Sequence, residues 1–500
     1  MLAQRDRVTT HPSGSDFIDT ITDLGSVENW DEPIAEVEWP ASYRDDLDRA
    51  REQSGSDESI ITGRASIRGE PVALIVGNFT FLGGSIGTAS ARRIVLGLRR
   101  ATSERLPVLA ATCSGGTRMQ EGTRAFVKMV EIVRAVIDHR NSGLPYLVYL
   151  RHPTTGGAFA SWGSLGQVTW AEPGALIGFL GPRVFEAISG SQFPAGVQRA
   201  ENLAAVGVID EVVPIAEVAT RTAQLLRLLR ATSERRHGSN LDPAARRPAP
   251  RRAVWDCVRL TRRPDRPGVQ QLLDHAAEDV VVLSGTGTGE LDAGLVLALA
   301  RFDGVSCVLI GQDRVAQAQK AIGPAALRVA RRGMRLAQEL RLPVVAVIDT
   351  AGADLSADSE ENALAGEIAR CIADFVSLSV PSVSVLLGEG SGGGALALFA
   401  AQRVIAAENA WLAPLSPEGA AAIAARDPAA APQMAEKQRI GAWDLLACGI
   451  VHRVVSEPVA AHLDPAGFVR QIARACVDLL GDQVVAVLGP VPSHALDARA

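Results

Sequence analysis

The sequence predicts an α/β protein made of two tandem copies of one unit. The stretch "RLPVLAATCSGG" that begins at Arg105 returns as "RLPVVAVIDTAG" at Arg341. Arg105 and Arg341 are 236 residues apart, and so are Pro145 and Pro381. Each of the two prolines begins an apolar run that ends near adjacent glycines. In both copies short β-branched runs alternate with helical patterns, as in βαβ units with buried parallel strands. Matched blocks in the same order and at a fixed interval indicate a duplication.

Composition excludes several classes of function. A net charge of −6 and an aromatic content of 4% predict neither a nucleic-acid partner nor an anionic membrane partner. The first residues lack the apolar segment of a signal peptide, and no run is apolar enough to span a membrane, so we expect a cytoplasmic protein. The six cysteines are scattered without a CxxC pair, which predicts neither a disulfide framework nor a metal site.

The chain length of 500 residues predicts more than one domain. Residues 1–55 are polar and acidic, and we expect them to wrap on the core or to be partly disordered. The first unit is predicted over 56–233 and the second over 269–490. Residues 234–268 are rich in Pro and Arg, which indicates a linker and a lead-in to the second unit. The arginines there fit either a solvated connector or a surface that attracts an anionic ligand.

Glycine-rich corners stand where the apolar runs give way to helices, as in "CSGG" from Cys113 to Gly116. A phosphate loop is excluded because no GK[ST] follows the glycines, and "GGSIG" from Gly83 lacks the dinucleotide spacing. A nucleophile at Cys113 or Ser114 would lack the G-x-S-x-G pattern, and the second copy has Asp349 and Thr350 there. Backbone N–H groups at a helix start can instead hold an oxyanion. The duplication therefore predicts two oxyanion sites.

Several motifs taken together resemble the carboxyltransferase subunits of acetyl-CoA carboxylase. The first half resembles the β-type subunit and the second half the α-type subunit. The motifs are "FTFLGGSIG", "CSGGTRMQEG", "HPTTGG", "AEPGALIGFLGPRV" and "PAGVQRAENL" in the first half, and "WDCVRLTRRPDRP", "VAVIDTAGA", "LAGEIAR", "LLGEGSGGGALAL" and "LSPEGAAAI" in the second. The resemblance implies two tandem domains of the crotonase type, the ClpP/crotonase-like ββα superhelix.

The resemblance also implies a reaction. A carboxyl group would pass from carboxybiotin on a separate carrier protein to acetyl-CoA or another short acyl-CoA, giving malonyl-CoA for fatty acid biosynthesis. Carboxybiotin would release CO2, the biotin enolate would take the α-proton of the thioester, and the thioester enolate would attack CO2. The implied partners are a biotin carboxyl carrier protein, a biotin carboxylase and a second copy of this chain, in a homodimer or a larger assembly. A decarboxylase component and a non-catalytic CoA-binding subunit are the alternatives.

The resemblance assigns roles to individual residues. Gly115 and Gly116 would hold the thioester oxygen, and Gly393, Gly394 and Ala395 the ureido oxygen of biotin. Arg118 would orient the corner or meet a phosphate, or else form a salt bridge with Glu121. Gln198 and Arg199 would line the entrance or pack. The remaining predicted contacts are Gly83, Gly84, Ser85, Gly156 and Gly157 along the CoA arm, and Pro417, Glu418 and Gly419 on the biotin side.

Two features depart from the family pattern. No cysteine precedes Cys113, so we expect the chain to lack the four-cysteine zinc module often found in the β-type subunit. The α-type subunit usually has a second Pro-Gly turn after the position of Asp349. Here the run "TAGADLSADSEENALAGE" stands in its place. We therefore expect a different shape on the biotin side.

Overall fold

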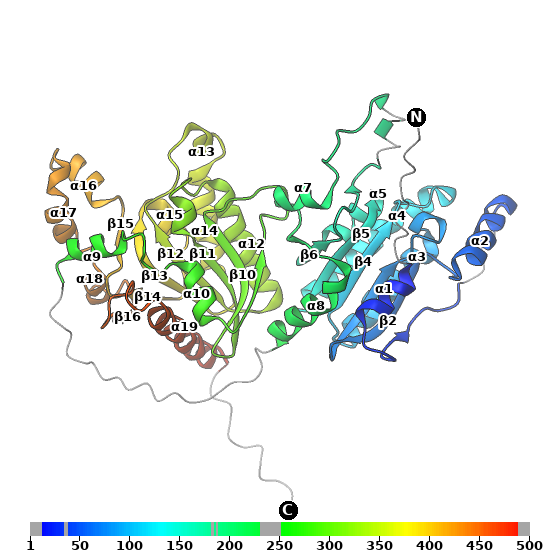
Figure 1. Cartoon of the computed structure of the whole chain (residues 1–500), viewed down its shortest axis with the longest axis horizontal. Helices are drawn as coiled ribbons and strands as arrows, with labels where there is room; N and C mark the ends of the chain where they lie inside the picture. The colour runs from blue at the N-terminus through cyan, green and yellow to red at the C-terminus, as the bar shows by residue number, and fades with distance from the viewer. Residues whose placement is uncertain (1–12, 35–38, 182–184, 187–188, 231–251, 489–500) are drawn as a thin grey trace, which may run out of the picture. The chain divides into compact units, whose positions relative to one another are not determined.

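A computed structural model describes residues 13–34, 39–181, 185–186, 189–230 and 252–488 (Figure 1). The chain divides into two compact units, with the boundary between Arg227 and Leu228, and the short stretch Gly287–Gly289 is grouped with the first unit. The predicted boundary at 233/234 lies outside the described residues, as do most of the linker and the predicted end at 490.

The first unit is built on an eight-stranded sheet of order β1-β2-β3-β4-β5-β6-β8, with β7 paired to β5. β1, β2 and β3 pair antiparallel and the other strands pair parallel. The strands are β1 Glu28–Asn29, β2 Ile60–Ile67, β3 Glu70–Gly77, β4 Val108–Ser114, β5 Tyr146–Thr155, β6 Val168–Ala171, β7 Ile177–Gly178 and β8 Glu211–Val212. The helices are α1 Gly14–Ile21, α2 Ala41–Ser54, η1 Leu82–Gly84, α3 Thr88–Ser103, η2 Met119–Glu121, α4 Thr123–Asn141, α5 Gly156–Phe159, η3 Trp162–Ser164, α7 Ala200–Ala205 and α8 Ile215–Arg230.

The second unit has an eight-stranded sheet of order β16-β14-β13-β12-β11-β10-β9, with β15 paired to β13. Its strands are β9 Asp279–Leu283, β10 Leu295–Phe302, β11 Val305–Gln312, β12 Val344–Thr350, β13 Ser382–Ser391, β14 Arg403–Ala407, β15 Trp411–Ala413 and β16 Arg453–Val455. Its helices are α9 Val254–Thr261, α10 Val269–Ala276, α11 Arg314–Gln317, α12 Pro324–Leu340, α13 Ala357–Glu361, α14 Leu364–Val376, α15 Gly392–Leu396, α16 Pro417–Ala424, η5 Pro428–Ala430, α17 Ala431–Gln438, α18 Ala442–Ala447 and α19 Pro465–Leu488.

The predicted duplication of an α/β unit is confirmed down to irregularities of the backbone. β4 and β12 occupy equivalent places in the two sheets, and every residue of each strand is buried. Both strands carry a register shift near the end, at Thr112/Ser114 in β4 and at Ile348/Thr350 in β12. Helices with one apolar face cover each sheet, as α3 covers β2 and β3 with Ile94 and Leu98. In each unit a glycine corner therefore follows the equivalent strand of the sheet, β4 in the first unit and β12 in the second.

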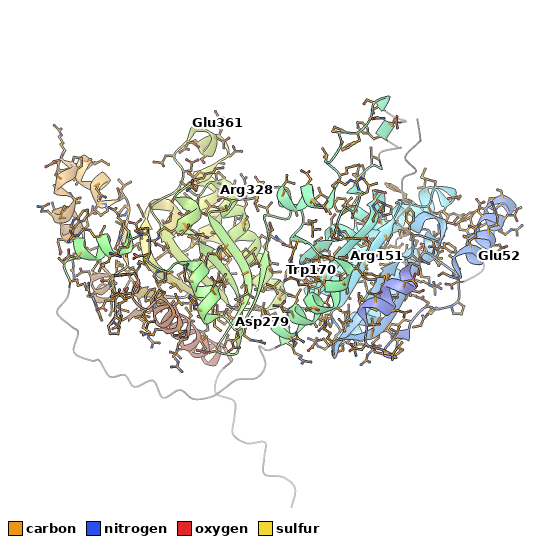
Figure 2. The ribbon with its side chains drawn as sticks, in the orientation of Figure 1. Glu52, Arg151, Trp170, Asp279, Arg328 and Glu361 are labelled. Carbon is orange, nitrogen blue, oxygen red and sulfur yellow. The ribbon has the colours of Figure 1, made fainter. Side chains whose placement is uncertain are left out.

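The described part of the N-terminal extension packs on the first unit, which agrees with the wrapped alternative. Phe17 of α1 is buried and stacks on Tyr149 of β5, with 5.6 Å between the ring centroids. The guanidinium of Arg151, which Figure 2 labels on the first unit, lies 4.6 Å from the Phe17 ring centroid. It also donates to the carbonyl oxygens of Gly77 and Ser13. The extension is therefore joined to the sheet through a buried cation.

Candidate active site

The first glycine corner follows β4 and touches a second corner. Gly116 has a φ of +110°, a conformation that L side chains rarely adopt. A Cβ on Gly116 would lie 3.3 Å from the Cα of Gly156, and a Cβ on Gly156 would lie 3.1 Å from the Cα of Gly116. These two corners are therefore in backbone contact, which explains why neither residue has a side chain.

The N–H groups of the first corner are used within the protein. The N–H of Gly115 donates to the carbonyl oxygen of Gly83 at 2.9 Å. The N–H of Gly116 donates to the hydroxyl oxygen of Ser114 at 3.0 Å. In this conformation neither donor is free for the thioester oxygen that the resemblance assigned to them.

The second corner of the first unit offers N–H groups that have no acceptor among the described residues. Gly156 follows β5 with a φ of +59°, and its N–H donates to the carbonyl of Phe179 at 2.9 Å. Gly157 and Ala158 occupy the next two positions of α5, where a helix supplies no acceptor of its own. The resemblance places Gly157 along the CoA arm and assigns no role to Ala158. The signal was available, because the same register places Gly393 and Gly394 in the second unit.

The corresponding corner of the second unit follows β13. Gly392 has a φ of +63° and begins α15. Gly393 and Gly394 are the second and third residues of this helix, and their N–H groups likewise have no acceptor among the described residues. Ala395 is the fourth residue, the first whose N–H can reach the carbonyl that precedes the helix. A Cβ on Gly352 would find its nearest neighbour, the Ser391 hydroxyl oxygen, at 4.0 Å. The two corners meet instead at the next residue, because a Cβ on Gly394 would lie 3.2 Å from the nitrogen of Ala353.

Arg118 is a buried anchor of the first corner and not a surface cation. Its side chain is 1% exposed and donates to Glu58 at 2.9 Å and to the Ser85 carbonyl at 2.7 Å. Glu121 lies 3.5 Å from the guanidinium. Burial alone would lower the pKa of Arg118, but the hydrogen bonds to Glu58 reverse this and raise the pKa. These contacts agree with two of the predicted alternatives, orientation of the corner and a salt bridge with Glu121, because protein acceptors enclose the guanidinium.

The remaining residues predicted for the CoA arm shape the backbone of the corner. Gly83 and Gly84 have φ values of +64° and +65° in η1. Gly84 packs so closely on the Cys113 carbonyl that a Cβ would overlap it. The Ser85 carbonyl accepts from both Arg118 and the Ser59 hydroxyl. These three residues thus hold the η1 turn against the end of β4.

Gln198 and Arg199 tie the loop around β7. The Gln198 amide donates to the Leu180 carbonyl at 2.7 Å and lies over Gly178, where a Cβ would overlap it. The Arg199 guanidinium donates to the Gly174 carbonyl at 2.7 Å, and its residue precedes α7. Both contacts agree with the packing alternative for this pair.

On the predicted biotin side, Pro417, Glu418 and Gly419 form the first turn of α16. Ser416 caps this helix by accepting from the Gly419 N–H at 3.2 Å. The Glu418 carboxylate accepts from Arg262 at 3.1 Å, and Arg262 also donates to Glu389 at 2.6 Å. Arg262 therefore joins α16 to the end of β13, next to the α15 corner.

Comparison with known proteins identifies the family. Residues 40–480 match the family described as carboxyl transferase domain. The chain belongs to this family. It is 53% identical over 459 residues to the probable biotin-dependent acyl-coenzyme A carboxylase beta3 subunit of Mycobacterium tuberculosis (strain ATCC 25618 / H37Rv), covering 91% of each chain. It is 38% identical over 450 residues to the acetyl-coenzyme A carboxylase carboxyl transferase subunits beta/alpha of Salinispora arenicola (strain CNS-205), covering 87% of this chain and 79% of that protein.

Solved structures establish the fold of this carboxyl transferase. The hexameric transcarboxylase 12S, solved with methylmalonyl-coenzyme A bound, matches with a TM-score of 0.72 at 20% identity. The match covers 94% of this chain and 90% of that chain. The predicted crotonase-like fold, in two tandem copies, is thereby confirmed.

The buried thiol beside the first corner does not fit nucleophilic chemistry. Cys113 donates through Sγ to the carbonyl of His152 at 3.1 Å, and burial raises the pKa of its thiol to about 11. We expect Cys113→Ala to keep carboxyl transfer within about two-fold while lowering the free energy of unfolding by about 1 kcal/mol. Steady-state kinetics and urea unfolding measure the two effects. Loss of transfer from a stably folded variant would restore the nucleophile hypothesis.

Asp349 is the counterpart of Cys113 and carries a buried carboxylate. One carboxylate oxygen accepts from the Glu389 N–H at 3.0 Å. The other has no hydrogen-bond donor and lies 3.7 Å from Arg314 Nε. Burial raises the pKa of Asp349 to about 6, and Arg314 only partly opposes this.

The raised pKa of Asp349 predicts a pH-dependent stability. Between about pH 4 and 6 the folded protein keeps a proton that the unfolded chain has lost. The stabilisation is therefore full below about pH 4, and about 2–3 kcal/mol of it is lost as the pH rises through 6. The difference in unfolding free energy between wild type and Asp349→Asn should fall by this amount in urea titrations across that range. A constant difference would contradict the prediction.

Three further observations concern cavities, metal-binding groups and membrane-spanning helices in the described part of the chain. A cavity of about 960 Å³ lies between α2, α3 and α4, and its lining includes Tyr43, Arg118 and Glu121 but none of the predicted glycines. No group of three or more His, Cys, Asp or Glu side chains among the described residues could hold a metal ion. Within the same ranges, no helix combines the length and the apolar character that a membrane span requires.

Proposed function

We propose that this chain is the carboxyltransferase component of a biotin-dependent acyl-CoA carboxylase. Its substrate would be acetyl-CoA or another short acyl-CoA, and its product malonyl-CoA or the corresponding carboxylated thioester. The observation that carries the proposal is the pair of repeat-related corners, Gly156–Ala158 and Gly392–Gly394, at the starts of α5 and α15. Both relatives described above are named as parts of acyl-CoA or acetyl-CoA carboxylases.

The two corners suit a reaction that develops negative charge on two oxygens. In the first unit we assign the thioester oxygen to the N–H groups of Gly157 and Ala158, since those of Gly115 and Gly116 already have acceptors. Gly115 and Gly116 then form the support on which that corner rests. In the second unit we assign the biotin ureido oxygen to the first turn of α15, from Gly393 to Ala395. Each such donor typically lowers the barrier by about 3–4 kcal/mol.

The reaction needs no titrating side chain of this protein. Carboxybiotin, arriving on a separate carrier protein, supplies both the carboxyl group and the base when it is bound. Carboxybiotin, when bound, would give its carboxyl group to the thioester α-carbon as its carbon–nitrogen bond broke, and the ureido nitrogen so released would take the α-proton. The corners would hold both oxygens throughout and exclude water from the reacting atoms. This agrees with the buried, engaged state of Cys113, Ser114 and Arg118.

We also propose that the first unit of one copy faces the second unit of another, in a homodimer or a larger assembly. Large apolar side chains are exposed at the same repeat positions in both units. Met119 and Leu355 are 83% and 88% exposed, and Phe179 and Leu415, which follow β7 and β15, are 65% and 45% exposed. Exposed apolar groups in matching places indicate surfaces that associate. Biotin carboxylase and the biotin carrier would complete the system in the cytoplasm.

Reconstitution tests this proposal. The purified chain is combined with a biotin carboxylase, a biotinylated carrier, ATP and bicarbonate, and acetyl-, propionyl- and long-chain acyl-CoA are offered as acceptors. We expect carboxylation of the short thioesters with the highest kcat/KM for one of them. Carboxylation of long-chain thioesters alone would refute the acceptor class. Binding of CoA thioesters without any carboxylation would refute the enzymatic proposal.

A further inference from the structure

The first turn of α15 is held by a side chain from another strand. The helix ends at Leu396, and the N–H of Leu398 donates to the Ala395 carbonyl, so the Gly394 carbonyl needs a partner outside the helix. Gln312, the last residue of β11, is fully buried and donates through Nε2 to the Gly394 carbonyl at 2.7 Å. This bond reaches the same turn that carries the N–H groups of Gly393 and Gly394.

The Gln312 amide is fixed at both ends. Its Oε1 accepts from the N–H of Asp349 at 3.0 Å. A backbone N–H can only donate and a carbonyl can only accept, so the two partners determine which way the amide faces. The amide thereby links the end of β12 to the start of α15. Both linked groups are buried, and loss of the side chain would leave both without partners.

No such link is present among the described residues of the first unit. Gly311 pairs with Val347 as Val76 pairs with Ala111, so the register places Gly77 where the second unit has Gln312. A Cβ on Gly77 would lie 2.6 Å from the Cys113 nitrogen, which leaves no room for a side chain. There the corner is supported by the contact between Gly116 and Gly156. In the second unit Gly352 makes no such contact; Ala353 takes its place, with its nitrogen 3.2 Å from a Cβ built on Gly394, and the Gln312 amide adds a link that Gly77 does not provide.

We propose that Gln312 is a positioning residue that orients the first turn of α15 for oxyanion stabilisation. This inference rests on the proposed function, because it gives that turn a role in transfer. A peptide unit is planar, so holding the Gly394 carbonyl also fixes the direction of the N–H in the same unit, that of Ala395. It restricts the adjoining units of Gly393 and Gly394 as well. A donor displaced by about 1 Å loses much of its effect on rate.

Two variants of the full chain test the proposal. Gln312→Met preserves the size of the side chain and removes both hydrogen bonds. Ser382→Ala is the control: its hydroxyl is buried at the other end of β13, where it accepts from the Gln402 N–H at 3.1 Å. Hydrogen–deuterium exchange of the peptide covering residues 391–398 reports on the first turn without any need for activity. Carboxyl transfer between malonyl-CoA and free biotin reports on kcat and on the KM of the thioester.

We expect Gln312→Met to speed exchange in residues 391–398, and to lower kcat by at least about 30-fold with the KM for malonyl-CoA changed less than about three-fold. Ser382→Ala should alter neither quantity in that way. Unchanged exchange in Gln312→Met would overturn the inference, and so would full kcat in that variant while wild type transfers. If wild type shows no transfer but exchange still rises, the proposed function fails and the holding role of Gln312 stands.

Discussion

Gly116→Val is expected to reduce carboxyl transfer to below about one-hundredth of the wild-type kcat/KM. Valine is β-branched and disfavours a φ of +110°. Its Cβ would also lie 3.3 Å from the Cα of Gly156 and 3.5 Å from the nitrogen of Gly157. The substitution therefore pushes on the corner to which we assign the thioester oxygen. Transfer between malonyl-CoA and biotin, measured on protein shown to be folded by circular dichroism, gives the effect.

Gly122→Ala separates this effect from backbone strain. Gly122 belongs to the same stretch and has a φ of +55°, but a Cβ there would meet nothing within 4 Å. We expect Gly122→Ala to lower stability by about 1–3 kcal/mol and to leave kcat near the wild-type value. Equal losses of transfer in the two variants would mean that strain, and not the contact between the corners, causes the loss in Gly116→Val.

The second large effect is expected for Gly393→Ala, in the first turn of α15. The added methyl group would lie 2.7 Å from Cδ1 of Ile368, the end of a flexible side chain that can move aside. The fold should therefore survive, and we expect the methyl group to obstruct the approach of the ureido oxygen to the N–H donors of this turn. We expect kcat for transfer to fall about 100-fold, the typical loss for one oxyanion donor, with the affinity for CoA thioesters retained. Calorimetry with CoA and steady-state transfer measure the two quantities.

The double variant Ile368→Val/Gly393→Ala removes the crowding atom. If the loss in Gly393→Ala arises at the oxyanion site, relieving the contact with Ile368 should leave kcat low. Recovery to near wild type in the double variant would show that displacement of α14, and not obstruction of the donors, had slowed transfer.

The fold could be predicted from the sequence because the same unit occurs twice in it, so that each copy supports the interpretation of the other. Buried parallel strands such as β4 and β12 are continuous apolar runs, and their ends are marked by glycines that the backbone requires. The register of the repeat also predicted which residues correspond, down to Cys113 and Asp349. The described part of the N-terminal extension could not be predicted as firmly, because Phe17, Ile18 and Ile21 form only a short apolar cluster in a polar segment.

The site was harder to predict because it depends on contacts between distant parts of the chain. Whether the Gly116 N–H is free is decided by the rotamer of Ser114, and whether Arg118 is free is decided by Glu58 on another segment. The choice of Gly157 and Ala158 over Gly115 and Gly116 therefore needed coordinates. The role proposed for Gln312 depends on the N–H of Asp349, at the register shift of β12, and on the short helix α15. Neither feature leaves a pattern in the sequence.

The most direct measurement incubates the purified chain with malonyl-CoA or methylmalonyl-CoA in the presence and absence of free biotin. The two-corner account predicts conversion to acetyl-CoA or propionyl-CoA that requires biotin and is lost in both Gly116→Val and Gly393→Ala. Binding of the thioester with no biotin-dependent conversion of either one would contradict the account and favour a non-catalytic CoA-binding subunit.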